Sequence, residues 1–182
     1  MYKKCFILLC FFGLSVGLFA QEDGQEIKSP ELKRFSIGAG FNLSSSIEDG
    51  PALDFGFLLY QSKNREADKN WDLRNNIMLK SFSFTNTNDI FILSEKISFG
   101  TMVRNGLFHF YDYVEGGIGF YTDGSKALFT TPLAFNFGGG FGLDILLHES
   151  VGFFIEAGYL GYMLDTKYSG GTIFQTGIRL FF

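Results

Sequence analysis

The 182-residue sequence contains two cysteines, two histidines and three prolines, and it has no long hydrophobic run after its first twenty residues. Both cysteines, Cys5 and Cys10, lie within that first stretch, so disulfides and thiol chemistry are excluded for the rest of the chain. Two histidines without cysteines make a metal-ligand cluster improbable, and we expect no cofactor. A helical membrane protein would show apolar runs of about 18 residues, and none follows the first stretch.

The first twenty residues predict a secretory signal peptide. Two lysines give a positive start, the apolar run 5–19 follows, and the polar run 21–24 comes next. We expect cleavage between Ala20 and Gln21, with the small residues at 15–17 as a second possible site. A lipoprotein acylated at Cys10 is disfavoured, because two leucines precede it where small residues are usual.

Removal of this peptide leaves 13 basic and 19 acidic residues, a net charge of −6. The remaining chain shows no basic patch, so we expect no nucleic-acid partner. The glycine-rich run 138–142 lies within a strand pattern, which is the wrong context for a nucleotide-binding loop.

The chain is rich in phenylalanine (24 residues) and glycine (23 residues), yet its mean hydropathy is only +0.14. High aromatic content without a spanning helix is typical of a membrane barrel, in which half of each strand is polar.

Residues 34–182 divide into segments in which apolar residues alternate with small or polar ones, the period of a β-strand. Residues 21–33 are polar, and we expect them to form a flexible periplasmic lead-in. Asn105-Gly106 predicts a tight hairpin turn, because both residues tolerate positive φ. The predicted strands are 35–44, 52–60, 71–84, 90–103, 107–121, 133–145, 151–163 and 172–182.

Segments of roughly 10 residues with a two-residue period match the strand length that a bilayer requires of a tilted barrel. Backbone groups in lipid must all be paired, so such a sheet must close on itself. We therefore predict an all-β fold, an eight-stranded antiparallel up-and-down transmembrane β-barrel formed by residues 34–182.

One face of the predicted strands collects the charged residues, and the other collects most of the phenylalanines. Alternation alone does not distinguish a membrane barrel with charges inside from a soluble barrel with charges outside. Many glycines share the charged face, which suits a narrow interior, and the phenylalanines would overfill a small core. The charged face carries Asp54, Asp72, Arg74, Lys80, Lys96, Glu115, Asp144, Glu156 and Arg179.

These five acids and four bases can neutralise one another, and an unpaired buried charge would be costly. We expect a filled, salt-bridged lumen with a structural role, rather than a gated ion path. An alternative is a conduit for small hydrophobic molecules, like that of OmpW, lined by bulky inward residues. The candidates for that lining are Tyr60, Tyr111, Tyr113, Tyr121, Phe154 and Leu160.

The last strand carries Phe174, Ile178, Leu180 and Phe182 on one face, and Arg179 and other polar or small residues on the opposite face. This ending resembles the terminal strand of small bacterial outer-membrane β-barrels of the OmpX, OmpA-barrel and opacity types. The runs 117–121, 137–144 and 153–159 carry the same resemblance.

The resemblance implies an outer-membrane location and gives those four apolar residues the role of an insertion signal. It also implies surrounding lipid, the barrel assembly machinery and periplasmic chaperones as partners, and a monomeric state. The connection from Gln61 to Asn70 departs from the family pattern, because periplasmic turns are usually short.

Some small outer-membrane barrels act on lipopolysaccharide through a histidine near the outer leaflet. Here His109 follows a hairpin and His148 lies in a turn, both on the periplasmic side if the two termini are periplasmic. We therefore expect turn or interface roles for both histidines, and no enzymatic activity. A secreted, soluble ligand-binding barrel is the alternative from a different functional class.

Overall fold

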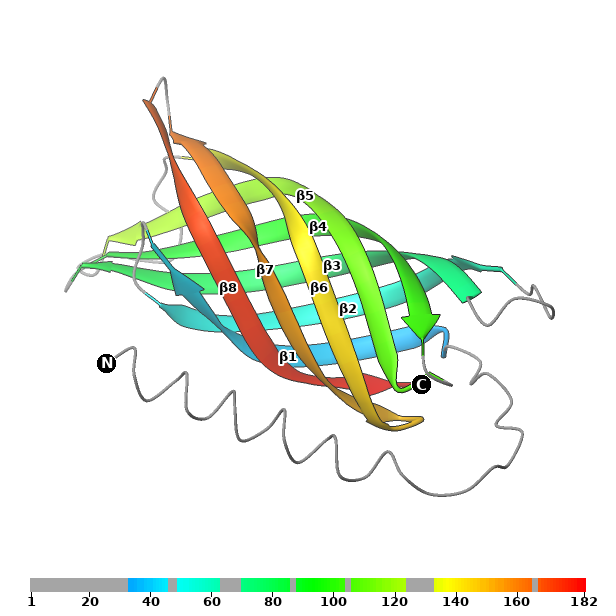
Figure 1. Cartoon of the computed structure of the whole chain (residues 1–182). Helices are drawn as coiled ribbons and strands as arrows, with labels where there is room; N and C mark the ends of the chain where they lie inside the picture. Colours follow the sequence, from blue (N-terminus) through cyan, green and yellow to red (C-terminus); the bar gives the residue numbers. More distant parts are fainter. Residues whose placement is uncertain are drawn as a thin grey trace, which may run out of the picture.

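The computed structural model describes residues 33–45, 49–62, 70–85, 88–103, 106–123, 133–164 and 167–182. Over these ranges the chain forms strands joined into one closed barrel (Figure 1). The strands are β1 (Phe35–Ser44), β2 (Gly50–Gln61), β3 (Asn70–Thr85), β4 (Asn88–Val103), β5 (Phe108–Asp123), β6 (Leu133–His148), β7 (Val151–Leu164) and β8 (Lys167–Phe181). The all-β class, the eight strands and the up-and-down antiparallel order are thus confirmed.

The expected signal peptide, its cleavage site at Ala20 and Gln21, and the lead-in up to residue 32 lie outside the described residues. Within the described ranges, no helix is long and apolar enough to cross a membrane.

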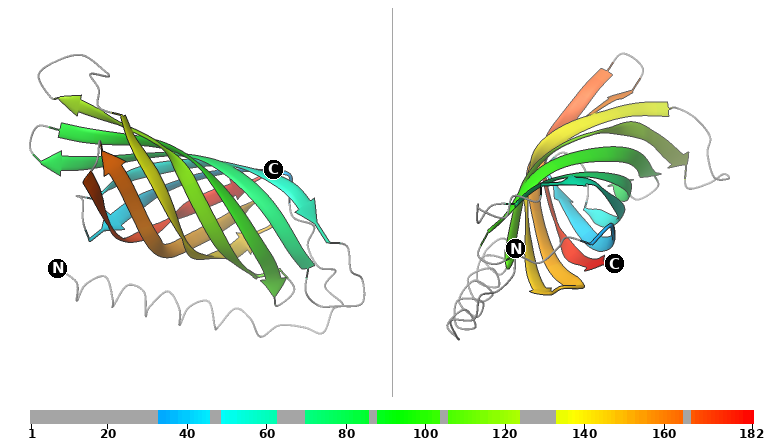
Figure 2. Two further views of the ribbon diagram at one scale, coloured as in Figure 1. Left: turned by 90° about the horizontal axis from the view of Figure 1, so that it is seen from above. Right: turned by 90° about the vertical axis from the view of Figure 1, so that its right-hand side faces the viewer.

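β1 and β8 close the barrel. Their antiparallel register is continuous from Ser36 opposite Phe181 to Ser44 opposite Ile173. Beside it, Phe35 N–H donates to Phe182 O at 3.1 Å, and Phe182 N–H donates to Phe35 O at 2.8 Å. Figure 2 shows the tilted strands wrapping round a common axis. Closure pairs the backbone of the first strand with that of the last, as a barrel in lipid requires.

Burial follows the expected two-residue period. Along β4, Ile92, Ser94 and Lys96 are buried, whereas Leu93 and Ile97 are exposed at 44% and 43%. The buried set fills the interior and the exposed set forms the outer face. Among the bulky residues expected inside, Tyr111, Tyr113, Phe154 and Leu160 are buried; the side chain of Tyr121 is outside the described set.

The expected inward position of Tyr60 is wrong. A bulge between Leu58 and Tyr60 shifts the pairing of β2 with β3. Leu59 and Tyr60 are consequently both exposed, at 57% and 51%, and the Tyr60 ring packs on Trp71 with centroids 4.8 Å apart. A bulge adds one residue to one strand, so every prediction of facing beyond it is inverted.

The loop predicted before the last strand is also wrong in extent. β8 begins at Lys167, and the stretch with Ser169 and Gly170 pairs with β7, where Gly170 lies opposite Gly161. Serine and glycine are typical of loops, but here they extend the β7–β8 ladder, because β7 pairs with them. The turn predicted at Asn105-Gly106 is supported by Gly106, which has φ of 86°.

Candidate functional site: the barrel interior

The structure places all nine predicted charged side chains inside the barrel. Each of these residues is at most 7% exposed. They come from seven strands: Asp54 on β2, Asp72, Arg74 and Lys80 on β3, Lys96 on β4, Glu115 on β5, Asp144 on β6, Glu156 on β7 and Arg179 on β8. We call these residues, with His109, the lumen network.

Arg179 is the centre of the lumen network. Its Nη2 contacts Asp54 Oδ2 at 2.6 Å and Glu156 Oε1 at 3.3 Å, and its Nη1 contacts Asp144 Oδ1 at 2.5 Å. Nη1 also donates to Tyr111 Oη at 3.2 Å. One guanidinium on β8 therefore holds groups from β2, β5, β6 and β7. The planar guanidinium has several N–H donors in fixed directions, so it can bind several acceptors at once better than the single ammonium of lysine.

Two lysines complete ion pairs across the interior. Lys80 Nζ on β3 lies 2.8 and 2.7 Å from the two carboxylate oxygens of Glu115 on β5. Lys96 Nζ on β4 lies 2.6 Å from Glu156 Oε1 on β7, which also accepts a 2.7 Å hydrogen bond from Tyr111. These pairs connect strands that are not neighbours in the sheet, so they fill the lumen and tie separate parts of the wall together.

His109 is a member of the lumen network, and the expectation that it serves as a turn or interface residue is wrong. It is 1% exposed, with Nδ1 2.9 Å from Asp144 Oδ2 and Nε2 2.8 Å from Asp72 Oδ2. Parity along β5 could have found it, because His109 is two residues before the inward Tyr111. His148, in contrast, is exposed at the turn after β6, where Nδ1 accepts a 3.3 Å bond from Ser150 N–H.

Both ring nitrogens of His109 face carboxylate oxygens. Carboxylate oxygens only accept hydrogen bonds, whereas a neutral imidazole has a single N–H. Both contacts are hydrogen bonds to carboxylates when the ring carries two protons, as an imidazolium does. With that extra positive charge, the five acids of the lumen network are matched by five cationic groups. A neutral sum avoids the free-energy cost of an uncompensated buried charge.

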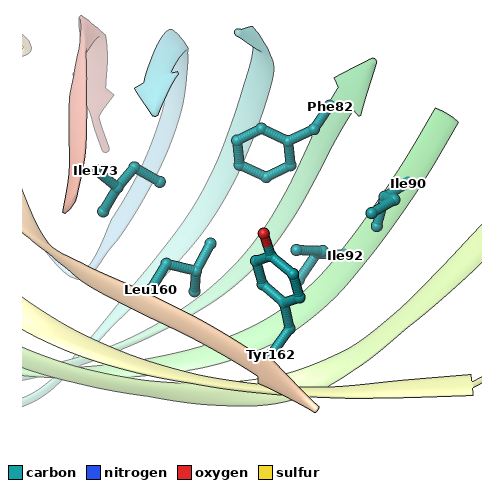
Figure 3. Close-up of a cluster of buried hydrophobic side chains, with 6 residues drawn as sticks. All are labelled: Phe82, Ile90, Ile92, Leu160, Tyr162 and Ile173. Carbon is teal, nitrogen blue, oxygen red and sulfur yellow. The ribbon is translucent and has the colours of Figure 1, made fainter. Parts of the chain in front are cut away.

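A second layer of buried side chains, which we call the apolar cap, lies next to the lumen network. It is at the end of the barrel opposite residues 33 and 182. Its side chains come from β3, β4, β7 and β8, and Figure 3 shows them pointing toward one another. Each residue is at most 5% exposed, so the cap fills the interior and does not line an open pocket. The cap consists of Phe82, Ile90, Ile92, Leu160, Tyr162 and Ile173.

A small cavity of about 10 Å³ lies within the network beside Arg74, next to Lys96 and His109. Its volume corresponds to about one water molecule. Arg74 Nε is 3.5 Å from Asp72 Oδ1, and the Arg74 guanidinium lies 5.4 Å from the centre of the inward ring of Phe181. The space in this part of the lumen is far smaller than the several hundred Å³ typical of ligand pockets.

The proposed insertion-signal residues lie on the outer face. Ile178, Leu180 and Phe182 are 57%, 43% and 58% exposed, and Phe174 is half-buried. Their alternation with the inward Arg179 and Gln175 follows the predicted pattern.

No protein-family model matches the sequence, and no curated protein sequence matches it. Solved structures do match its fold. Neisserial surface protein A is 12% identical, with 84% of this chain covering 99% of that one at a TM-score of 0.58. Ail of Yersinia pestis in a phospholipid nanodisc is 18% identical over 82% and 99% of the two chains, with a TM-score of 0.39. The outer-membrane enzyme PagL is 10% identical over 80% and 97%, with a TM-score of 0.47.

At these identities the likeness concerns the fold alone, and the match to Neisserial surface protein A carries it. Closure of eight antiparallel strands, the apolar outer face and the charged interior agree with the resemblance found in the sequence. The chain has the fold of the small outer-membrane β-barrels.

Proposed function

We propose that this protein is an integral outer-membrane barrel whose filled polar lumen gives it a structural or surface role without catalysis. The observation that carries the proposal is that apolar residues lie outside the barrel and charged residues inside, the reverse of a soluble protein. Its outer face exposes large apolar residues such as Phe141 (65%) and Ile178 (57%), while its interior holds the paired charges of the lumen network. Exposed apolar surface of this extent marks contact with a membrane or another protein.

The state of His109 supports the absence of catalysis. A general base needs a ring nitrogen that can take a proton from a nucleophile. Both nitrogens of His109 instead contact carboxylates, at 2.8 and 2.9 Å. Within the described interior, this histidine holds Asp72 and Asp144 together and is not placed to activate a serine or a water.

The same proposal includes biogenesis. Phe174, Ile178, Leu180 and Phe182 would be read by the barrel assembly machinery after export, with periplasmic chaperones escorting the unfolded chain. The support is their outward, apolar position on the strand that closes the barrel.

Heat modifiability tests membrane location and fold together. We expect the protein in isolated outer membranes to migrate differently on an SDS gel when boiled and unboiled, because a closed barrel resists SDS until heated. Recovery of the whole protein as a soluble species without detergent would contradict the proposal and support a soluble ligand-binding barrel.

Conductance tests the filled lumen separately. In planar bilayers, the purified protein is expected to give no stable steps, since the apolar cap and the lumen network occupy the interior. A general porin incorporated under the same conditions serves as the positive control. Large, long-lived steps from this protein would show that the lumen conducts.

A further inference from the structure

The outer face of β4 carries a carboxylate where a lipid-facing surface should be apolar. Glu95 is the eighth of the sixteen residues of β4, and it is exposed. Its neighbours on that face are Leu93 and Ile97, exposed at 44% and 43%, and Phe99, at 54%, follows. An acid at the middle of such a band is expensive in lipid, and ionisable residues there usually mark function.

Glu95 is held in a polar pair. Asn75 Nδ2 on β3 donates a 2.5 Å hydrogen bond to Glu95 Oε1, and this is the only hydrogen bond of Glu95 among the described residues. Among the strand side chains that the structure describes, the outer face offers no counter-charge. All Lys and Arg side chains described within the strands are buried: Arg74, Lys80, Lys96 and Arg179.

The pair lies beside a glycine. Gly116 on β5 is directly opposite Glu95 in the β4–β5 register. A Cβ placed on Gly116 would meet only Asn136 O within 4 Å, at 3.8 Å, so no side chain covers this point. Small residues on a membrane-facing surface allow another chain to approach closely.

We propose that Asn75, Glu95 and Gly116 form the centre of a contact with a second copy of this protein in the membrane. In the protonated form of Glu95, its O–H can donate to Oδ1 of the partner's Asn75, while each Asn75 keeps its own bond to Glu95 Oε1.

A second copy fits this surface because the patch complements itself. Each copy presents the acid O–H of Glu95 and the second N–H of Asn75 as unused donors, and the amide oxygen of Asn75 as an unused acceptor. A two-fold axis brings each acid O–H to the other copy's amide oxygen, as an isologous contact requires. The inference rests on the membrane location proposed above, and it departs from the monomer expected from the sequence.

Sedimentation equilibrium in density-matched detergent tests self-association. We expect the wild type to dimerise, Glu95→Leu to weaken dimerisation about tenfold through loss of two symmetric hydrogen bonds, and Glu95→Gln to retain it. Thr172→Leu, a matched polar-to-apolar change on the outer face of β8, should behave as the wild type. An apolar residue suits the lipid face, so Glu95→Leu should fold, which unboiled gels of the same samples would verify.

Cysteine cross-linking in native membranes provides an independent test, because the chain after residue 10 has no cysteine. Oxidation of Gly116→Cys should yield a dimer, whereas Thr172→Cys on the opposite wall should not. A wild type that stays monomeric while showing heat modifiability would overturn the dimer alone. Equal dimerisation of Glu95→Leu and wild type, or cross-linking of Gly116→Cys only to a different protein, would also overturn it. Loss of heat modifiability itself would instead refute the membrane barrel.

Discussion

Replacing Arg179 by methionine is expected to lower the free energy of unfolding by about 3–5 kcal/mol, because it leaves the buried Asp54 without its counter-charge and removes one partner each from Asp144 and Glu156. Arg179 is the shared partner of Asp54, Asp144 and Glu156, and it is only 4% exposed. Methionine fills similar space, so the loss would come chiefly from charge and hydrogen bonding. Denaturant unfolding in lipid vesicles can be followed through the single tryptophan, Trp71, on the outer face.

Two variants make this measurement specific to the lumen network. Arg34→Met makes the same chemical change at an exposed position just before β1, and it should leave unfolding nearly unchanged. Asp54→Asn added to Arg179→Met removes the carboxylate whose counter-charge among the described residues is Arg179, so the double variant should regain part of the loss. If Arg179→Met and Arg34→Met unfold at the same denaturant concentration, the lumen network contributes nothing measurable to stability.

The alternation of side chains is the part of this fold that can be predicted from the sequence. A two-residue period assigns each strand residue to one face, so it placed Asp144 and Glu156 inside without knowledge of their partners. The same rule applied to β5 would have placed His109 inside. Its closeness to a hairpin favoured a turn role, although the predicted strand 107–121 already included this residue.

Pairing across the lumen could not be predicted. Lys96 and Glu156 are 60 residues apart, and they meet because β4 and β7 face each other across the interior. That proximity depends on the register of every ladder between them, and alternation does not determine register. Tyr60 illustrates the limit within one strand, since a single bulge places it on the outer face.

The seam that closes the barrel depends on glycine in a way that alternation does not reveal. Gly177 on β8 lies opposite Gly40 on β1, and both face inward. A Cβ on Gly177 would overlap the carbonyl oxygen of Ala39 and lie 2.5 Å from Gly40 Cα. These neighbours are backbone atoms, so they cannot move aside as the end of a flexible side chain would.

Gly177→Val is therefore expected to prevent most of the protein from assembling, because valine would force β1 and β8 apart where the sheet must close. Overpacking alone typically costs about 1–3 kcal/mol, and separating these strands would also leave backbone groups unpaired in lipid. The measurement is the heat-modifiable fraction in outer membranes at equal synthesis. Gly116→Val is the matched control, since its Cβ has open space on the outer face. Equal assembly of the two variants would mean that β1 and β8 can separate enough to admit valine, and that closure does not require glycine at this pair.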